Sequence, residues 1–276
     1  MTRIALCQIP VSEDPAANLR RARESLARAA DDGAELAILP EAALTRYGKR
    51  ILELAEPLDG PFVTGLAETA RDRGLSVIAG VFEPASARDG GAARDDGRVR
   101  VHNTAVALGP DGGIRAAYRK IHLFDSFGAR ESALVVPGDD PVVVELAGLR
   151  VGLVTCYDIR FPELTRALAD LGADLFTVIA AWGSGPMKEE HWATLVRARA
   201  IENTTWAAAV GQAPNPEAAD GFGIGRSMLV DPMGVVRADL GPAPAVQTCV
   251  VDPQITIVTR NAVPCLEHRR LGVNRS

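Results

Sequence analysis

Apolar runs typical of strands alternate with helical patterns along the 276 residues of this chain, and the same order occurs twice. Six segments have the short apolar pattern of buried strands: residues 4–9, 36–39, 75–82, 150–155, 174–180 and 205–211. Four segments have helical spacing: residues 14–30, 61–73, 162–171 and 189–203. This alternation predicts an α/β fold whose strands are buried in sheets beneath helices.

Local signals mark where these elements begin and end. Asp14 is a candidate N-cap for the first helix, and Gly74 is placed to end the second. Turn residues at 109–113 and 231–234 predict two hairpins, and a further turn at 147–148 joins strands at 142–146 and 150–155. Residues 84–98 are rich in Ala, Gly, Asp and Arg and are expected to form a solvated loop.

Each half therefore predicts strands and helices followed by a hairpin, without a residue-level repeat between the halves. Two such halves would pack sheet on sheet with the helices outside. No Pro- or Ser-rich linker separates them, so we expect one domain over residues 1–276, with a C-terminal extension at about 253–276.

The composition excludes several classes of protein. Lys and Arg number 30 against 35 Asp and Glu, and this net charge of −5 argues against a general nucleic-acid binder. No apolar run approaches the 18 residues of a membrane span, and no secretory signal is recognisable. The four cysteines are far apart without metal-ligand spacing, which predicts free thiols in a reducing, cytoplasmic setting and no bound metal.

Three residues place a reactive group next to an apolar segment. Glu41 follows the strand pattern at 36–39, Lys120 ends a strand pattern, and Cys156 ends the most convincing buried strand. Ligand sites of α/β folds gather at such strand ends, and a helix beginning near Pro162 could favour a thiolate. Taken singly, each residue has an ordinary explanation: a solvated acid, a solvated cation and a buried small apolar side chain.

Familiar catalytic motifs are absent from the sequence. It contains no G-x-S-x-G elbow, no P-loop and no H-E-x-x-H zinc motif. The four histidines lie in no known Cys–His signature, so a nucleophilic Cys156 would lack an obvious imidazole base.

Taken together, these segments resemble the nitrilase superfamily of carbon–nitrogen hydrolases. That family carries a Glu-Lys-Cys triad in this chain order. The matching strings run from residue 3 to about 252: Leu39-Pro40-Glu41, residues 118–123 (YRKIHL), residues 155–164 (TCYDIRFPEL), Trp192 with residues 198–203 (ARAIEN), and residues 225–234.

The resemblance implies a four-layer α-β-β-α sandwich and a triad of Glu41, Lys120 and Cys156. It also implies a fourth polar residue, matched by Glu131, and no metal or organic cofactor. Members of this superfamily pair so that two sandwiches extend into one, which implies a homodimer or larger assembly. The Tyr157-Asp158 pair after the cysteine is similar to the Nit-like and ω-amidase branch, whereas true nitrilases tend to carry Trp-Glu.

The expected reaction is hydrolysis of a small, carboxylate-bearing amide through a cysteine thioester, with release of ammonia. Lys120 and the backbone N–H of Tyr157 would stabilise the oxyanion. Arg160, Arg130 and Lys188 are candidates for binding a substrate carboxylate, although Arg160 could instead pair internally with a nearby acid.

Three alternatives remain open at this stage. The substrate could be an N-carbamoyl amino acid, hydrolysed by the same four groups, or an aliphatic amide or nitrile. The chain could also be an inactive sandwich used for binding or assembly. Residues 181–188 depart from the Nit pattern and border the pocket in that family, so the sequence leaves the identity of the substrate open.

Overall fold

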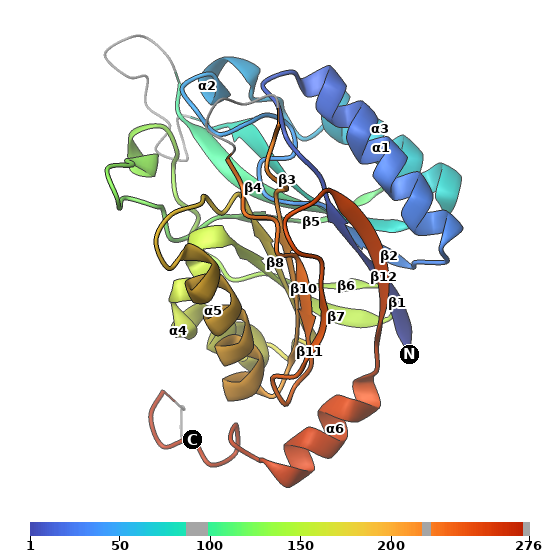
Figure 1. The fold of residues 1–276 in the computed structure, drawn as a ribbon, viewed down its shortest axis with the longest axis vertical. Helices are drawn as coiled ribbons and strands as arrows, with labels where there is room; N and C mark the ends of the chain where they lie inside the picture. The colour runs from blue at the N-terminus through green and yellow to red at the C-terminus, as the bar shows by residue number, and fades with distance from the viewer. Residues whose placement is uncertain (87–98, 217–221, 273–276) are drawn as a thin grey trace.

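The computed structural model describes residues 1–86, 99–216 and 222–272, and it contains two six-stranded sheets (Figure 1). The first sheet has the order β12-β1-β2-β3-β4-β5: Ala245–Val251, Thr2–Gln8, Leu36–Ile38, Ser76–Pro84, Val101–Leu108 and Ile114–Arg119. The second has the order β11-β10-β9-β8-β7-β6: Val236–Asp239, Met228–Val230, Trp206–Gly211, Leu175–Ala180, Leu149–Thr155 and Val143–Leu146.

Helices cover the outer face of each sheet. α1 (Pro15–Asp31) and α3 (Pro61–Arg73) lie on the first sheet, and α4 (Pro162–Asp170) and α5 (Lys188–Asn203) lie on the second (Figure 1). The remaining helices are short or terminal: α2 (Ile51–Leu54), η2 (Glu131–Ala133), η3 (Cys156–Arg160) and α6 (Pro253–Ala262). The predicted α/β sandwich with helices outside is confirmed.

The period-2 pattern of β1 shows how one strand serves two layers. Ile4 and Leu6 belong to the core that lies between the sheets. Ala5 and Cys7 point the other way, into a second core shared with α1 and α3. Because both faces of such a strand are buried, its sequence is a continuous apolar run.

Both expected hairpins form, at β4–β5 and β10–β11, and Asp14 caps α1 by accepting from two backbone N–H groups. Most of the loop expected at residues 84–98 lies outside the described residues. Within the described part of the chain, no helix has the length and apolar character needed to cross a membrane.

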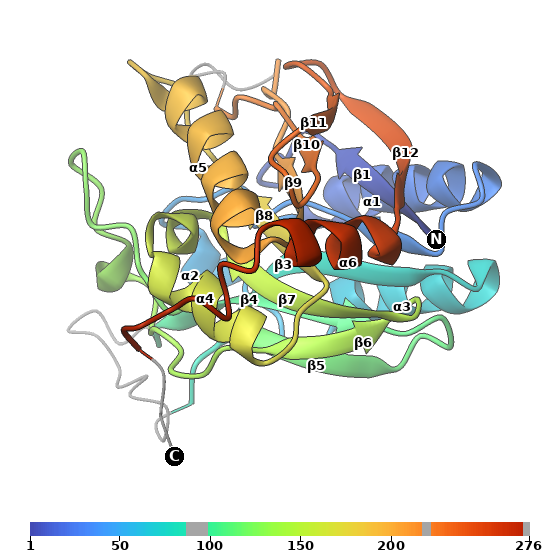
Figure 2. The same cartoon turned by 90° about the horizontal axis from the view of Figure 1, so that it is seen from below.

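The sequence did not predict β12, α2 or α6. β12 pairs antiparallel with β1, joining the two ends of the chain at one sheet edge. Most of its residues are partly exposed, so it lacks the continuous apolar run of a central strand. α6 follows β12 and lies in front in Figure 2, which views the molecule of Figure 1 from below. Here Trp206 donates to the carbonyl of Asp252 over 3.1 Å, and Arg269 pairs with Asp170.

Candidate active site

Strand direction brings the candidate residues to one edge of the sandwich. β2 runs parallel to β3, and β5 has the same direction because it is antiparallel to β4, which is antiparallel to β3. The segments that leave β2 and β5 carry Glu41 and Lys120. In the second sheet, parallel β7 and β8 end directly before Cys156 and Ala181. Residues far apart in the sequence therefore meet at one site.

A tight crossing over β3 fixes the position of Glu41. Gly80 in β3 donates its backbone N–H to Pro40 O over 3.1 Å, and Gly80 O accepts from the backbone of Ala43 over 2.7 Å. A side chain at residue 80 would have its Cβ 2.5 Å from the Cα of Glu41. The side chain of Gln212 also donates to the Glu41 carbonyl over 2.8 Å. The glutamate backbone is therefore held from both sheets.

Lys120 lies between two buried carboxylates. Its Nζ is 3.1 Å from Oε1 of Glu41 and 2.9 Å from Oε2 of Glu131, and all three side chains are no more than 3% exposed. Burial by itself disfavours the ammonium, but Glu41 and Glu131 hold the pKa of Lys120 well above its usual value. The lysine is therefore a fixed positive charge at neutral pH.

Every carboxylate oxygen of the two glutamates accepts a hydrogen bond. Asn103 Nδ2 donates to Oε1 of Glu41 over 2.8 Å and to Oε1 of Glu131 over 3.1 Å. The second oxygen of Glu41 accepts from the backbone N–H of Ala181, and that of Glu131 from the backbone N–H of Phe124, each over 2.6 Å. These bonds orient both carboxylates and offset the cost of burying them.

Cys156 is the first residue of η3, at the sharp turn that directly follows β7. Its φ is +51°, a left-handed conformation that is rare for a residue with a side chain and that marks strain. Burial is the main reason that the pKa of its thiol is raised well above the usual value, and the negative charge of Glu41 raises this pKa further. The Lys120 ammonium only partly offsets the two effects. The thiol therefore needs a neighbouring base to react at neutral pH.

Asp158 ties the turn of Cys156 to the segment of Lys120. This fully buried carboxylate accepts from Thr155 N over 3.1 Å, from the Tyr118 hydroxyl over 2.7 Å and from His122 N over 2.9 Å. Because Tyr118 and His122 flank the lysine, one side chain joins the two segments.

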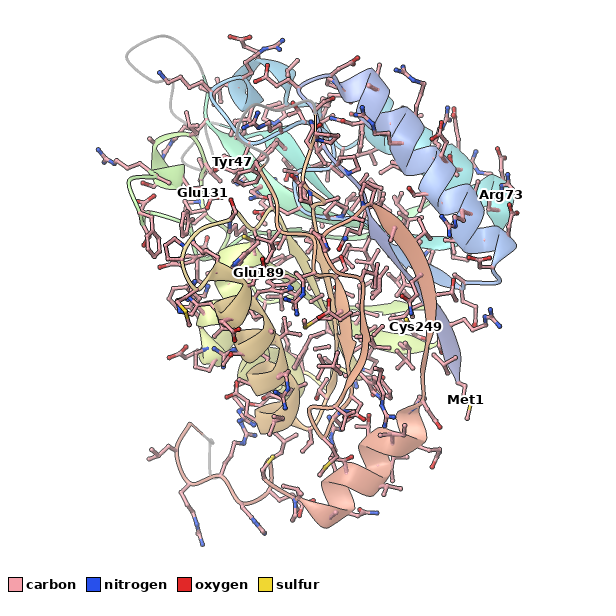
Figure 3. All side chains as sticks on the ribbon, in the orientation of Figure 1. Met1, Tyr47, Arg73, Glu131, Glu189 and Cys249 are labelled. Atoms are coloured by element: carbon pink, nitrogen blue, oxygen red, sulfur yellow. The ribbon has the colours of Figure 1, made fainter. Side chains whose placement is uncertain are left out.

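A pocket of about 550 Å³ opens above these groups. The lining residues include the cations Arg46, Lys49, Lys120, Arg130 and Lys188 and the aromatic residues Tyr47, Phe124, Phe127, Tyr157, Trp182 and Phe222. Figure 3 labels two residues of this lining, Tyr47 and Glu131, which lie near each other. Within the ranges described, no three His, Cys, Asp or Glu side chains are grouped so that they could hold a metal ion.

The structure brings Glu41, Lys120, Glu131 and Cys156 together in this lining, along with Tyr157, Arg130 and Lys188. Lys188 rests on aromatic rings, with Nζ 4.3 Å from the centre of Phe127 and 5.6 Å from that of Trp182.

Arg160 is not part of the pocket lining. Its guanidinium lies 5.0 Å from the ring centre of Trp182 and 6.0 Å from that of Tyr157. No ion pair from Arg160 to Asp158 or Glu163 is formed within the described residues; its guanidinium lies against these two rings and 3.4 Å from Nδ1 of His191.

Asn103 and Tyr47 are among the residues of the site that the sequence did not indicate. Asn103 lies in β4, an apolar strand, and the local sequence does not indicate that its amide contacts two glutamates. Tyr47 lies in a loop six residues after Glu41. Burial is the main reason that the pKa of Tyr47 is raised well above its usual value, and the negative charge of Glu131 raises it further, so the hydroxyl stays protonated.

Comparisons of this chain with known proteins identify a family model and several similar proteins. The model of the carbon-nitrogen hydrolase family matches residues 3–261. A hydrolase of Mycobacterium tuberculosis is 42% identical over 97% of this chain and 95% of its own length. Deaminated glutathione amidase of Escherichia coli O157:H7 is 35% identical over 90% of this chain and 89% of its own.

Among solved structures, an amidase variant from Nesterenkonia sp. AN1 aligns with a TM-score of 0.80 at 27% identity, over 98% of this chain and 94% of its own. That structure carries the acetamide moiety of fluoroacetamide covalently added at the active-site cysteine of the Nesterenkonia enzyme.

Proposed function

The chain belongs to the carbon–nitrogen hydrolase family and is a hydrolase of the amidase type, and we propose that it cleaves a small, carboxylate-bearing amide through a thioester on Cys156. The observation that carries this proposal is the convergence of one thiol, one ammonium and two carboxylates at the floor of a single pocket. Such a set provides a nucleophile, a base and an electrostatic stabiliser.

In the first step, the sulfur of Cys156 attacks the amide carbon while Glu41 takes the thiol proton. The carbonyl oxygen becomes an oxyanion, which Lys120 and the backbone N–H of Tyr157 stabilise. One such donor contributes about 3 kcal/mol of transition-state stabilisation. Glu41 then gives its proton to the nitrogen, the carbon–nitrogen bond breaks, and ammonia leaves.

The second step releases the acid. Water attacks the thioester carbon, Glu41 takes a proton from that water, and the carbon–sulfur bond breaks as the proton returns to the sulfur. Glu131 holds Lys120 in place through both steps, as its 2.9 Å contact supports. Glu41 therefore acts as base and acid in turn, and the positive charge stays on Lys120.

The charges around the pocket support a carboxylate on the substrate. Glu41 and Glu131 lie at its floor, whereas Arg46, Lys49, Arg130 and Lys188 contribute cations to the rest of the lining. Burial is the main reason that the pKa of Lys188 is lowered, and repulsion from Arg160 lowers it further. A bound carboxylate would raise this pKa again. We favour Lys188 as the principal partner of that carboxylate.

The test of activity is release of ammonia from purified protein incubated with amides of α-keto acids, deaminated glutathione, carbamoyl amino acids and nitriles. A thioester intermediate should be trapped as a hydroxamate by hydroxylamine, and Cys156→Ala should form none. Carbon dioxide released with the ammonia would instead identify carbamoyl amino acid hydrolysis. No turnover of any of these compounds would favour a binding or assembly role.

A matched pair of substrates tests the carboxylate. Succinamate and butyramide have the same chain length, and only succinamate carries the charge. Lys188→Ala should lose about fivefold in kcat/KM on succinamate and little on butyramide, because a partly solvated ion pair is worth about 1 kcal/mol. Arg73→Ala is the control, since Arg73 pairs with Asp31 at the surface and is not part of the lining. Equal losses on both substrates would favour a neutral aliphatic amide.

A further inference from the structure

Asn103, on β4, contacts both glutamates of the site at once. Its Nδ2 donates to Oε1 of Glu41 over 2.8 Å and to Oε1 of Glu131 over 3.1 Å. The same two oxygens accept from Lys120 Nζ, over 3.1 and 3.2 Å. The four atoms close a ring in which each carboxylate oxygen lies between an amide nitrogen and an ammonium nitrogen.

This ring holds an unbalanced charge. Two carboxylates face one ammonium, and Asn103, Glu41, Glu131 and Lys120 are all at least 97% buried. The other titratable groups that face them, the Tyr47 hydroxyl and the Cys156 thiol, have raised pKa values and are neutral at pH 7. One negative charge is therefore in excess, and the two carboxylates repel each other, which makes neutral donors between them stabilising.

The asparagine amide suits this position for a chemical reason. It has two N–H hydrogens on one nitrogen, so it can donate to each carboxylate without adding charge. An aspartate would add a third negative charge, and a serine could donate to a single carboxylate. The backbone carbonyl of Asn103 also accepts from Lys120 N over 2.9 Å, so the residue lies directly beside the lysine on the neighbouring chain segment.

We propose that Asn103 is a positioning residue that holds the Glu41 and Glu131 carboxylates together beside Lys120, so that Glu41 stays in place to take the Cys156 proton. The inference rests on the proposed amidase function, because that function makes Glu41 the base. Asn103 acts through the two glutamates and does not touch the reacting atoms.

The pH profile of kcat/KM tests this role. Asn103→Leu removes both donors to the charged carboxylates, so the acidic limb of the profile should move to higher pH by about one unit. Above that limb the rate should return to within about threefold of wild type. Asn103→Ser keeps a hydroxyl donor and should shift the limb by less.

A matched control is Asn203→Leu. Asn203 is also fully buried, and its Nδ2 donates to Arg199 O over 3.0 Å and to the Thr165 hydroxyl over 3.4 Å, but it is not part of the pocket lining. This variant should lower the melting temperature and leave the pH profile in place. It separates loss of a buried amide from loss of this particular one.

An unchanged acidic limb in Asn103→Leu, or a loss of equal size at every pH, would overturn the inference. If the leucine variant does not fold, the serine variant decides by the same criterion. Alkylation of Cys156 by iodoacetamide gives a second profile that needs no amide turnover. A shifted alkylation profile in a protein that hydrolyses no amide would refute the amidase proposal alone, whereas active protein with unshifted profiles would refute the role of Asn103 alone.

Discussion

Replacing Gly80 with alanine should displace Glu41 without altering any charged side chain. The new Cβ would be 2.5 Å from Glu41 Cα and 2.6 Å from the backbone nitrogen of Ala42. Both contacts are with backbone, which cannot turn aside as a long side chain can. The segment must retreat by about 0.9 Å to reach the 3.4 Å of an ordinary contact.

A displacement of this size moves the proposed base away from the thiol. Misplacing a reacting group by about 1 Å costs about 100-fold in rate, or about 2.7 kcal/mol of activation free energy. We therefore expect Gly80→Ala to lower kcat about 100-fold while KM changes little, because most of the pocket lining, at residues 120–134, 156–157 and 181–188, lies on other segments.

The assay measures kcat and KM on the best amide found, with rates normalised to the Cys156 thiol titrated in folded protein. Gly65→Ala is the matched control, because its Cβ would meet Leu19 Cδ2 at 2.7 Å, at the end of a flexible side chain between α1 and α3. That variant should keep its activity. If Gly80→Ala keeps kcat within about threefold of wild type, or if both variants lose equally, the crossing at Gly80 does not position Glu41.

Three further predictions follow from the thiols and the surface. Cys156→Ala should abolish turnover with an unchanged circular dichroism spectrum, whereas Cys249→Ala should keep its activity; a few per cent of wild-type rate in the former would refute the triad. Burial raises the pKa of Cys7 to about 12, so this thiol should resist iodoacetamide in native protein, and the free energy of unfolding should fall above about pH 9, where the unfolded chain loses the proton first. Ile201 and Met233 are about half exposed, and light scattering should report a dimer or larger particle; a mass of 29.2 kDa would refute this.

Much of the fold could be predicted because its central strands and outer helices carry local patterns. The apolar run of β7 predicts a strand buried on both faces, and the order of strands and helices predicts sheets beneath helices. The spacing of Glu41, Lys120 and Cys156, read with the surrounding strings, was enough to indicate the family. These signals are local because a strand buried on both faces requires an apolar side chain at nearly every one of its own positions.

Strand pairing and side-chain contacts were decided only by the tertiary structure. β12 pairs with β1, which lies at the other end of the sequence. The partly exposed residues of β12 do not indicate this partner. The backbone N–H of Ala181 reaches the carboxylate of Glu41 only because the two sheets pack face to face with their strand ends at one edge. Asn103 acquires its two glutamate contacts within the first sheet, because β4 pairs between β3 and β5 and the segments that leave β2 and β5 carry the two glutamates. A contact between residues 62 positions apart depends on how strands pair, and one between residues 140 positions apart depends on how the two sheets pack. The sequence of a single segment specifies neither.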